Sequence, residues 1–153
     1  MYSRQEAAQI KQAFWTSFGS YMAPVPSADG EKLNWINYKT GEKHLYFKMN
    51  ADNKEASIGI FLTHPDQGVR DLYYEQLVEL KFLLEATIGE PWIWQQRFYD
   101  DQGKEASRIF TNVSGKSIMK QEHWPALISF FKPRIIALDA FWSNVKHLFE
   151  ALR

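Results

Sequence analysis

The chain has 153 residues, with 18 Lys and Arg against 18 Asp and Glu, and it contains no cysteine. The even charge balance excludes a global basic field for nucleic acid, although it leaves room for a local basic face. The absence of cysteine excludes disulfides, thiolate nucleophiles and cysteine-held zinc or iron–sulfur centres. Aromatic residues make up 16% of the chain, and not all of them need fit inside one small core, so some can line a pocket or an interface.

The length predicts one domain over residues 1–153. The N-terminus, MYSRQEAAQI, is polar and does not have the pattern of a secretory signal. No apolar run approaches the roughly 20 residues of a membrane span. These features predict a cytoplasmic protein that does not interact with a membrane.

The first part of the chain predicts one helix followed by extended segments. Residues 3–6, SRQE, have the pattern of a capping box, and Pro24 disfavours helix in the residue before it, so a helix is expected over about 4–22. The segments 33–39 and 44–49 are rich in residues that favour strands, and Thr40-Gly41 between them indicates a turn.

The middle of the chain predicts a third strand and a long helix. After a turn at 52–54, the sequence ASIGIFLTH is apolar at nearly every position, as expected of a central strand covered on both faces. The three strands are expected to form an antiparallel meander. A broad apolar stripe then predicts a helix of about 23 residues from Pro65 to Ile88, which Gly89 ends.

The last part predicts a hairpin and a final helical region. Segments 92–99 and 105–111 flank the turn signal at 100–103, and helical spacing resumes at about residue 121. Pro133 predicts a kink there, or two abutting helices. The order α-β-β-β-α-β-β-α predicts an α+β fold, with a five-stranded, mainly antiparallel sheet packed by three major helices.

One pattern suits a Mg²⁺-dependent nuclease. An α-β-β-β-α-β order also occurs in restriction-endonuclease-like enzymes, in which an Asp and a following Asp/Glu-x-Lys hold Mg²⁺ and activate water. Asp29, Asp52 and Lys54 match that pattern loosely. The competing interpretation is that Asp52 only shapes a turn between two strands.

Another pattern suits a binding face. Lysines cluster near aromatic residues and a histidine in the first predicted meander, and two arginines fall in the second hairpin. Cations neutralise phosphates and aromatic rings stack on bases, although cross-strand pairs on an ordinary exposed sheet have the same composition. The candidate binding residues are Lys39, His44, Tyr46, Lys48, Arg97 and Arg108. The four histidines lack zinc-ligand spacing, so no metal site is predicted.

Several segments together resemble an uncharacterised bacterial protein family. They are FWTSFGSYM, INYKTG with HLYFKM, LLEATIGEPWIW, ASRIF and EHWPALISFFKPRI. Similar domains occur C-terminal to predicted restriction-endonuclease-like nuclease domains in longer chains. The resemblance therefore implies a nucleic-acid or defence context, without identifying catalytic residues. Of the shared positions, Arg108 is the first choice for a functional residue, because a charge on a predicted strand must be exposed, paired or bound to an anion.

The leading hypothesis is a non-enzymatic binding module without a cofactor, acting on nucleic acid or on a nucleic-acid-processing protein. The first alternative is the Mg²⁺-dependent nuclease that uses Asp29, Asp52 and Lys54. The second alternative is a homo-oligomeric structural protein, such as a homodimer, with the Phe141-Trp142 pair either in the core or at the contact.

Overall fold

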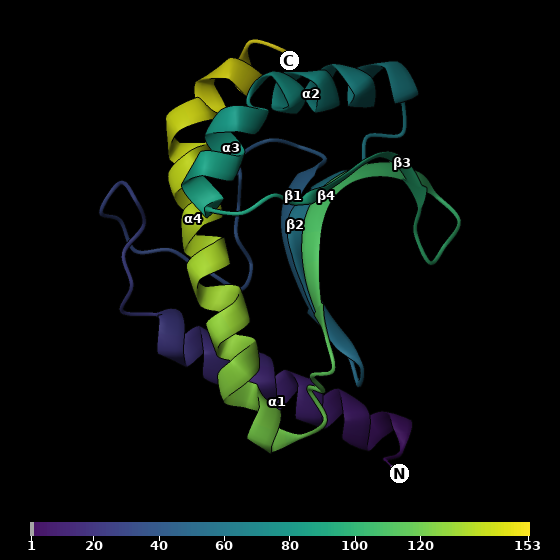
Figure 1. Cartoon of the computed structure of the whole chain (residues 1–153), viewed down its shortest axis with the longest axis vertical. Coiled ribbons are helices and arrows are strands. Elements are labelled where there is room, and N and C mark those ends of the chain that lie inside the picture. The colour runs from purple at the N-terminus through teal and green to yellow at the C-terminus, as the bar shows by residue number, and fades with distance from the viewer. Residues whose placement is uncertain (1) are drawn as a thin grey trace.

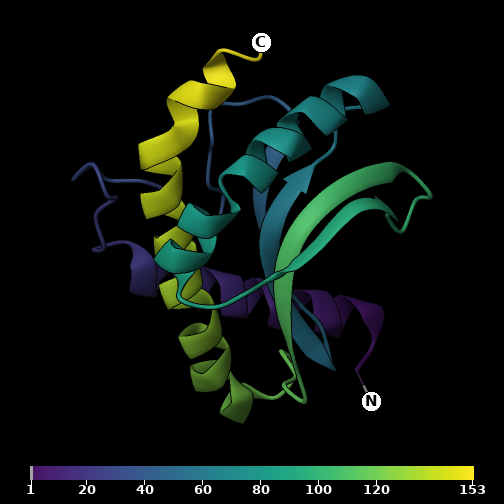
Figure 2. The same cartoon turned by 45° about the horizontal axis from the view of Figure 1, so that its top comes forward.

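One antiparallel sheet and a layer of helices on one of its faces make up the molecule (Figure 1), for which the computed structural model describes residues 2–153. The helices gather on one side of the sheet in both views (Figures 1 and 2). In chain order the elements are α1 (Arg4–Met22), β1 (Leu45–Ala51), β2 (Glu55–Leu62), α2 (Gln67–Glu79), α3 (Lys81–Ile88), β3 (Ile93–Tyr99), β4 (Glu105–Ser114), the short 3-10 helix η1 (Gln121–His123) and α4 (Trp124–Glu150).

The sheet has the strand order β1-β2-β4-β3, and every neighbouring pair is antiparallel. Leu45 pairs with Leu62 across the first hairpin, and Leu62 pairs in turn with Ser107 of β4. The strands β2 and β4 therefore form the middle of the sheet, and α2 and α3 lie on the connection between β2 and β3.

The core lies between the sheet and the helices. Phe14 and Phe18 of α1 and Phe131 and Leu138 of α4 are fully buried there, against the even-numbered residues of β2 such as Ile58. Helix α1 begins as predicted, because Ser3 and Glu6 form both hydrogen bonds of a capping box. The Phe141-Trp142 pair is also buried in this core.

The α+β class and the antiparallel sheet are confirmed, but the prediction of five strands is wrong. Residues 33–39 form no strand and lie in the long connection from α1 to β1. Side-chain hydrogen bonds hold that connection instead. Trp35 Nε1 donates to the Val25 carbonyl, and the buried Asp139 of α4 accepts from Tyr38 Oη at 2.6 Å and from the Ala28 amide at 2.7 Å.

The helix count is also corrected, from three major helices to four α-helices within residues 2–153. The helix expected over 65–88 is divided at Leu80, which has φ −96° and ψ 7° and joins α2 to α3. In contrast, α4 continues through Pro133 as one helix of 27 residues. Both halves of α4 are buried against the rest of the protein, and this packing maintains a helix that lacks one backbone hydrogen bond at the proline.

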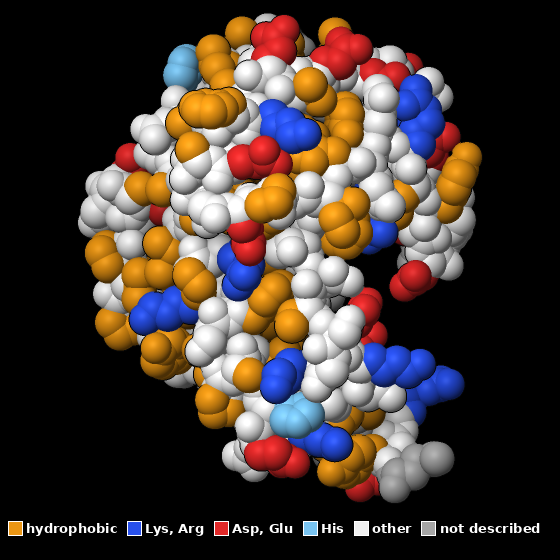
Figure 3. Space-filling view, viewed as in Figure 1, with side chains coloured by type: hydrophobic (Ala, Val, Ile, Leu, Met, Phe, Trp, Pro, Cys, Tyr) orange, Lys and Arg blue, Asp and Glu red, His pale blue; other side chains and the backbone are white. Residues whose placement is uncertain are grey.

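No helix of residues 2–153 covers the other face of the sheet, which corrects the expectation that β2 is enclosed on both sides (Figure 2). The β3–β4 hairpin bends over this face, because the pairing register shifts between Gln95 and Phe98. Such an irregularity bends a strand and increases its twist. Figure 3 shows the resulting hollow at the right of the molecule, below the hairpin.

Candidate functional site

The uncovered face of the sheet carries the residues that alternate with the buried ones. On β1 these are Tyr46 and Lys48, because they alternate with Leu45 and Phe47, which point into the core. The pairing places Tyr46 in one row with Phe61 and Arg108, and Lys48 in the next row with Gly59 and Phe110. Three strands thus bring cations and aromatic rings together on one surface, which we call the open face.

Both cations of the open face lie against aromatic rings. Lys48 Nζ is 5.2 Å from the centre of the Phe61 ring and 5.5 Å from that of Tyr46. Arg108 Cζ lies 4.3 Å from the Phe98 ring centre and 4.0 Å from the Phe110 ring centre. These distances are typical of cation–π contacts, and they hold the two cations in place on the surface.

Neither cation has an ion-pair partner within residues 2–153. Arg108 Nε donates to the neutral side chain of Gln95 at 2.6 Å. Burial lowers the pKa of Arg108 below its ordinary value, and the Glu55 carboxylate partly opposes this effect. A guanidinium nevertheless stays charged at neutral pH, so the open face carries two positive charges that form no ion pair within residues 2–153.

A cavity of about 400 Å³ lies on the open face. The side chains of Lys48, Phe61, Phe98 and Arg108 contribute to its lining. Two carboxylates of the β3–β4 turn, Asp100 and Asp101, border it at the hairpin end. The cavity therefore has a cationic, aromatic floor and an acidic edge.

The other three predicted binding residues lie elsewhere. Arg97 donates to Asp71 of α2 at 3.0 Å and lies 3.6 Å from Glu105, so it takes part in a structural ion-pair network. Lys39 is exposed on the connection before β1. His44 ends that connection and contacts His64, with 4.8 Å between ring centres. The structure thus brings together Tyr46, Lys48 and Arg108 but not these three.

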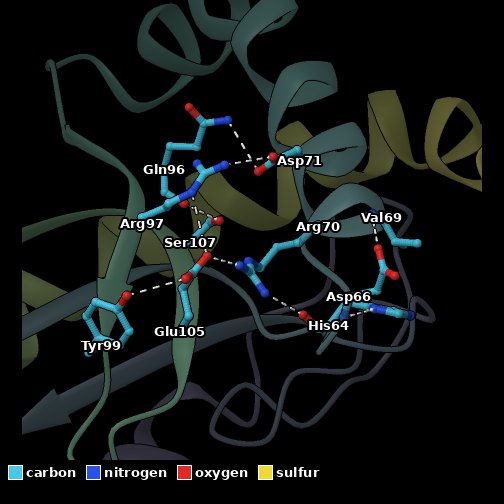
Figure 4. Close-up of polar contacts among 10 residues, drawn as sticks. All are labelled: His64, Asp66, Val69, Arg70, Asp71, Gln96, Arg97, Tyr99, Glu105 and Ser107. Carbon is cyan, nitrogen blue, oxygen red and sulfur yellow. Dashed lines mark hydrogen bonds and ion pairs between the residues drawn. The ribbon is translucent and has the colours of Figure 1, made fainter.

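The ion-pair network joins α2 to the bent hairpin (Figure 4). Arg70 is buried, with 2% of its surface exposed, and its guanidinium pairs with Glu105 of β4 and donates to the His64 carbonyl at 2.8 Å. Glu105 lies between Arg70 and Arg97. The network therefore connects the hairpin that borders the open face to the helical layer.

The three residues of the nuclease hypothesis do not lie together. Asp29 accepts a hydrogen bond from Ser143 and lies 3.8 Å from Lys146, both on α4. Asp52 accepts from the amides of residues 54 and 55 and so shapes the β1–β2 turn. The connection with Asp29 and this turn are on opposite sides of the molecule (Figure 1).

Two further observations concern metals and membranes. Within residues 2–153, no group of three or more His, Asp or Glu side chains is arranged to hold a metal ion. No helix in the same part of the chain combines the length and the apolar character that crossing a bilayer would require.

Sequence reasoning missed the rings that enclose Arg108 and the contact between His44 and His64. Phe98 and Phe110 lie on separate strands, and only the register of β3 and β4 brings them to the same guanidinium. The histidine contact had a usable signal. A hairpin centred on the predicted turn at 52–54 pairs Leu45 with Leu62, which leaves His44 before the first strand and His64 after the second, both at the open end of the hairpin.

Comparison with known proteins identifies the family of the chain. No curated protein and no solved structure matches it. A family model described as a domain of unknown function, DUF4268, matches residues 10–146, which is more than half of the chain. This result confirms the resemblance to an uncharacterised family. The protein is therefore a member of the DUF4268 family.

Proposed function

We propose that the open face binds single-stranded nucleic acid. The observation that carries this proposal is the pair of cations without an ion-pair partner within residues 2–153, Lys48 and Arg108, set among the rings of Tyr46, Phe61 and Phe98. Proteins that bind single strands combine cations, which contact the phosphates, with aromatic side chains, on which the bases stack. A duplex hides the faces of its bases within the stack, so rings on a sheet favour a single strand.

The charge distribution on the open face suggests how a nucleic-acid strand would lie there. Phosphates would contact Lys48 and Arg108, while Asp100 and Asp101 at the hairpin end would repel them. That end of the cavity therefore suits bases, whose polar edges can donate hydrogen bonds to carboxylates. The hollow below the hairpin (Figure 3) suits a flexible strand better than a rigid duplex.

The test is fluorescence anisotropy with labelled single-stranded DNA, single-stranded RNA and duplex DNA, each long enough for one site of about 10 nucleotides. We expect the single strands to bind more tightly than the duplex, and the affinity to fall steeply between about 50 and 200 mM salt. The substitution Arg108→Ala is expected to weaken binding by about tenfold or more, and Lys48→Ala by several-fold.

The matched control is Lys132→Ala. Lys132 also lies over an aromatic ring, Tyr21, with 4.8 Å from Nζ to the ring centre, but it belongs to α4 in the helical layer. This control removes the same charge and a similar cation–π contact, so its affinity should match that of the unmodified protein. Equal losses of nucleic-acid affinity in all three variants, or no salt-sensitive binding to any probe, would contradict the proposal. Binding to a protein partner would then be the alternative to pursue.

A further inference from the structure

A second cavity, of about 480 Å³, lies where the 41–44 segment, the start of α2 and the end of the chain meet. This volume falls within the range of about 300–1,000 Å³ that small-molecule sites occupy. Its apolar lining includes Leu62 and Tyr73. Its acidic, basic and histidine lining residues are Glu42, Lys43, His44, His64, Arg70 and Arg153.

Basic side chains outnumber acidic side chains in the lining of this cavity. Three of the lining residues are Lys or Arg. One lining residue, Glu42, has an acidic side chain. Glu42 is already engaged, because it is buried, accepts from Arg153 Nε at 2.9 Å and also accepts from Tyr73 Oη at 3.2 Å. Arg70 is paired with Glu105 outside the lining, so Lys43 is the lining cation without an ion-pair partner within residues 2–153.

Arg70 also has an unused donor. Its guanidinium contacts the His64 carbonyl and Glu105, but its Nε is buried and has no hydrogen-bond partner within residues 2–153. A buried N–H group without an acceptor is unfavourable and rare in native proteins. The Arg70 side chain, with 2% of its surface exposed, lines the cavity, so a ligand there would lie beside this guanidinium.

The two histidines at the cavity are held in unusual ways. His44 has a φ of +67°, a left-handed conformation that is uncommon for a residue other than glycine. Its carbonyl accepts from the Thr63 amide, which brings its ring against that of His64. His64 Nδ1 accepts from the Asp66 amide, so the neutral ring carries its proton on Nε2 as a donor. Strained residues of this kind cluster at ligand sites.

We propose that this cavity binds a small organic anion, with the anionic group contacting Arg70, Lys43 and the two histidines, and an apolar body against Leu62 and Tyr73. The site is separate from the open face, whose cations line a different cavity. Burial, together with His64 and Lys43, lowers the pKa of His44. A bound anion would favour the protonated imidazole, so binding is linked to proton uptake.

The test uses naphthalene-2-sulfonate as the probe and NMR of the histidine rings as the readout. Its uncharged counterpart, naphthalene-2-sulfonamide, has the same body, and inorganic sulfate lacks the body. His123 and His147 are internal references, because they do not line the cavity. We expect saturable shifts at His44 and His64 with the sulfonate, and binding about tenfold or more weaker with the sulfonamide or with sulfate.

The variant His44→Asn removes the imidazole but keeps a residue that tolerates the left-handed conformation. It should fold normally and bind the sulfonate several-fold more weakly, as monitored at His64. The sulfonate keeps its charge between about pH 5 and 8, where histidines titrate, so a rise in affinity as the pH falls reports on the imidazoles. This rise should be smaller in His44→Asn.

The control Lys48→Ala changes the open face and should bind the sulfonate as the unmodified protein does. Three outcomes would each overturn the proposal: no shift at His44 and His64, equal affinity for the sulfonamide, or unchanged affinity in His44→Asn. None of them bears on nucleic-acid binding at the open face.

Discussion

Gly59 allows the aromatic ring of Phe110 to lie across the open face. The two residues are directly paired between β2 and β4. A Cβ atom at position 59 would come within 2.6 Å of both the Ile109 carbonyl oxygen and the Phe110 Cβ. Arg108 packs on that same ring, so the absence of one side chain on β2 determines how the guanidinium is held on β4.

We predict that Gly59→Ala destabilises the protein by about 1–3 kcal/mol, because the added methyl group forces two central strands apart. Urea unfolding followed by circular dichroism measures this change. The control is Gly19→Ala in α1, where the new methyl would meet only the flexible end of Ile36 and alanine favours the helix. An unfolding midpoint for Gly59→Ala as high as that of the control would contradict the prediction.

Sequence reasoning at the residue scale selected both Arg97 and Arg108 as binding residues, with Arg108 as the first choice, and the structure separates the two. Arg108 follows the alternation of β4 onto the open face, whereas Arg97 lies at the register shift of β3 and turns to Asp71 of α2. Alternation could be predicted from the sequence. The register shift could not, because it depends on how two strands pair and not on either strand alone.

At the scale of elements, the prediction succeeded where the determining interactions are local. Helix α1 matches the predicted 4–22 because its capping box and the following proline act over a few residues. The segment 33–39 has strand-forming residues but no strand partner, so tertiary hydrogen bonds to Val25 and Asp139 decide its conformation. Leu80 fits the apolar stripe, so the break between α2 and α3 had no sequence signal.

The connection between α3 and β3 is tied to α4 by one ion pair. Glu90 accepts from Arg134 Nε at 2.6 Å and from Nη2 at 3.1 Å. The hydrogen bond from Arg134 lowers the pKa of Glu90 below its ordinary value. The folded state therefore binds the Glu90 proton less tightly than the unfolded chain, whose Glu pKa is about 4.3.

We predict that Glu90→Gln lowers the free energy of unfolding by about 1 kcal/mol at neutral pH, since both partners are partly exposed. The Glu90 contribution is present above the unfolded pKa and disappears as the pH falls through about 4.3 and below. Urea unfolding at several pH values should therefore show the two proteins converging in acid. Glu75→Gln removes the charge of an exposed glutamate of α2 and should show no such difference. A difference that persists in acid would contradict the assignment.

At the scale of the whole molecule, the network of Arg70, Glu105 and Arg97 joins the two layers (Figure 4). It lies between the open face and the second cavity, because Glu105 belongs to the bent hairpin and Arg70 lines the cavity. The pairs differ in burial, since the Arg70 side chain is 2% exposed and that of Arg97 is 38% exposed. Their contributions to stability should differ accordingly.

We predict that Glu105→Ala destabilises the protein by about 3 kcal/mol, because it leaves the Arg70 guanidinium buried without a carboxylate. Arg97→Ala should cost less than about 1 kcal/mol, as exposed ion pairs do. Thermal and urea unfolding of the two variants test this contrast. Equal losses of stability in the two variants would contradict this prediction, because they would mean that burial of Arg70 makes no difference.

The sequence by itself determined the α+β class, the first helix, both hairpins and the side of β1 on which Tyr46 and Lys48 lie. Each depends on caps, turns and alternation, which act over a few neighbouring residues. Only the tertiary structure decided that the sheet has four strands and an uncovered face, that Phe98 and Phe110 enclose Arg108, and that His44 meets His64 beside Arg70. These features depend on register and packing between segments far apart in the chain, which no local pattern specifies.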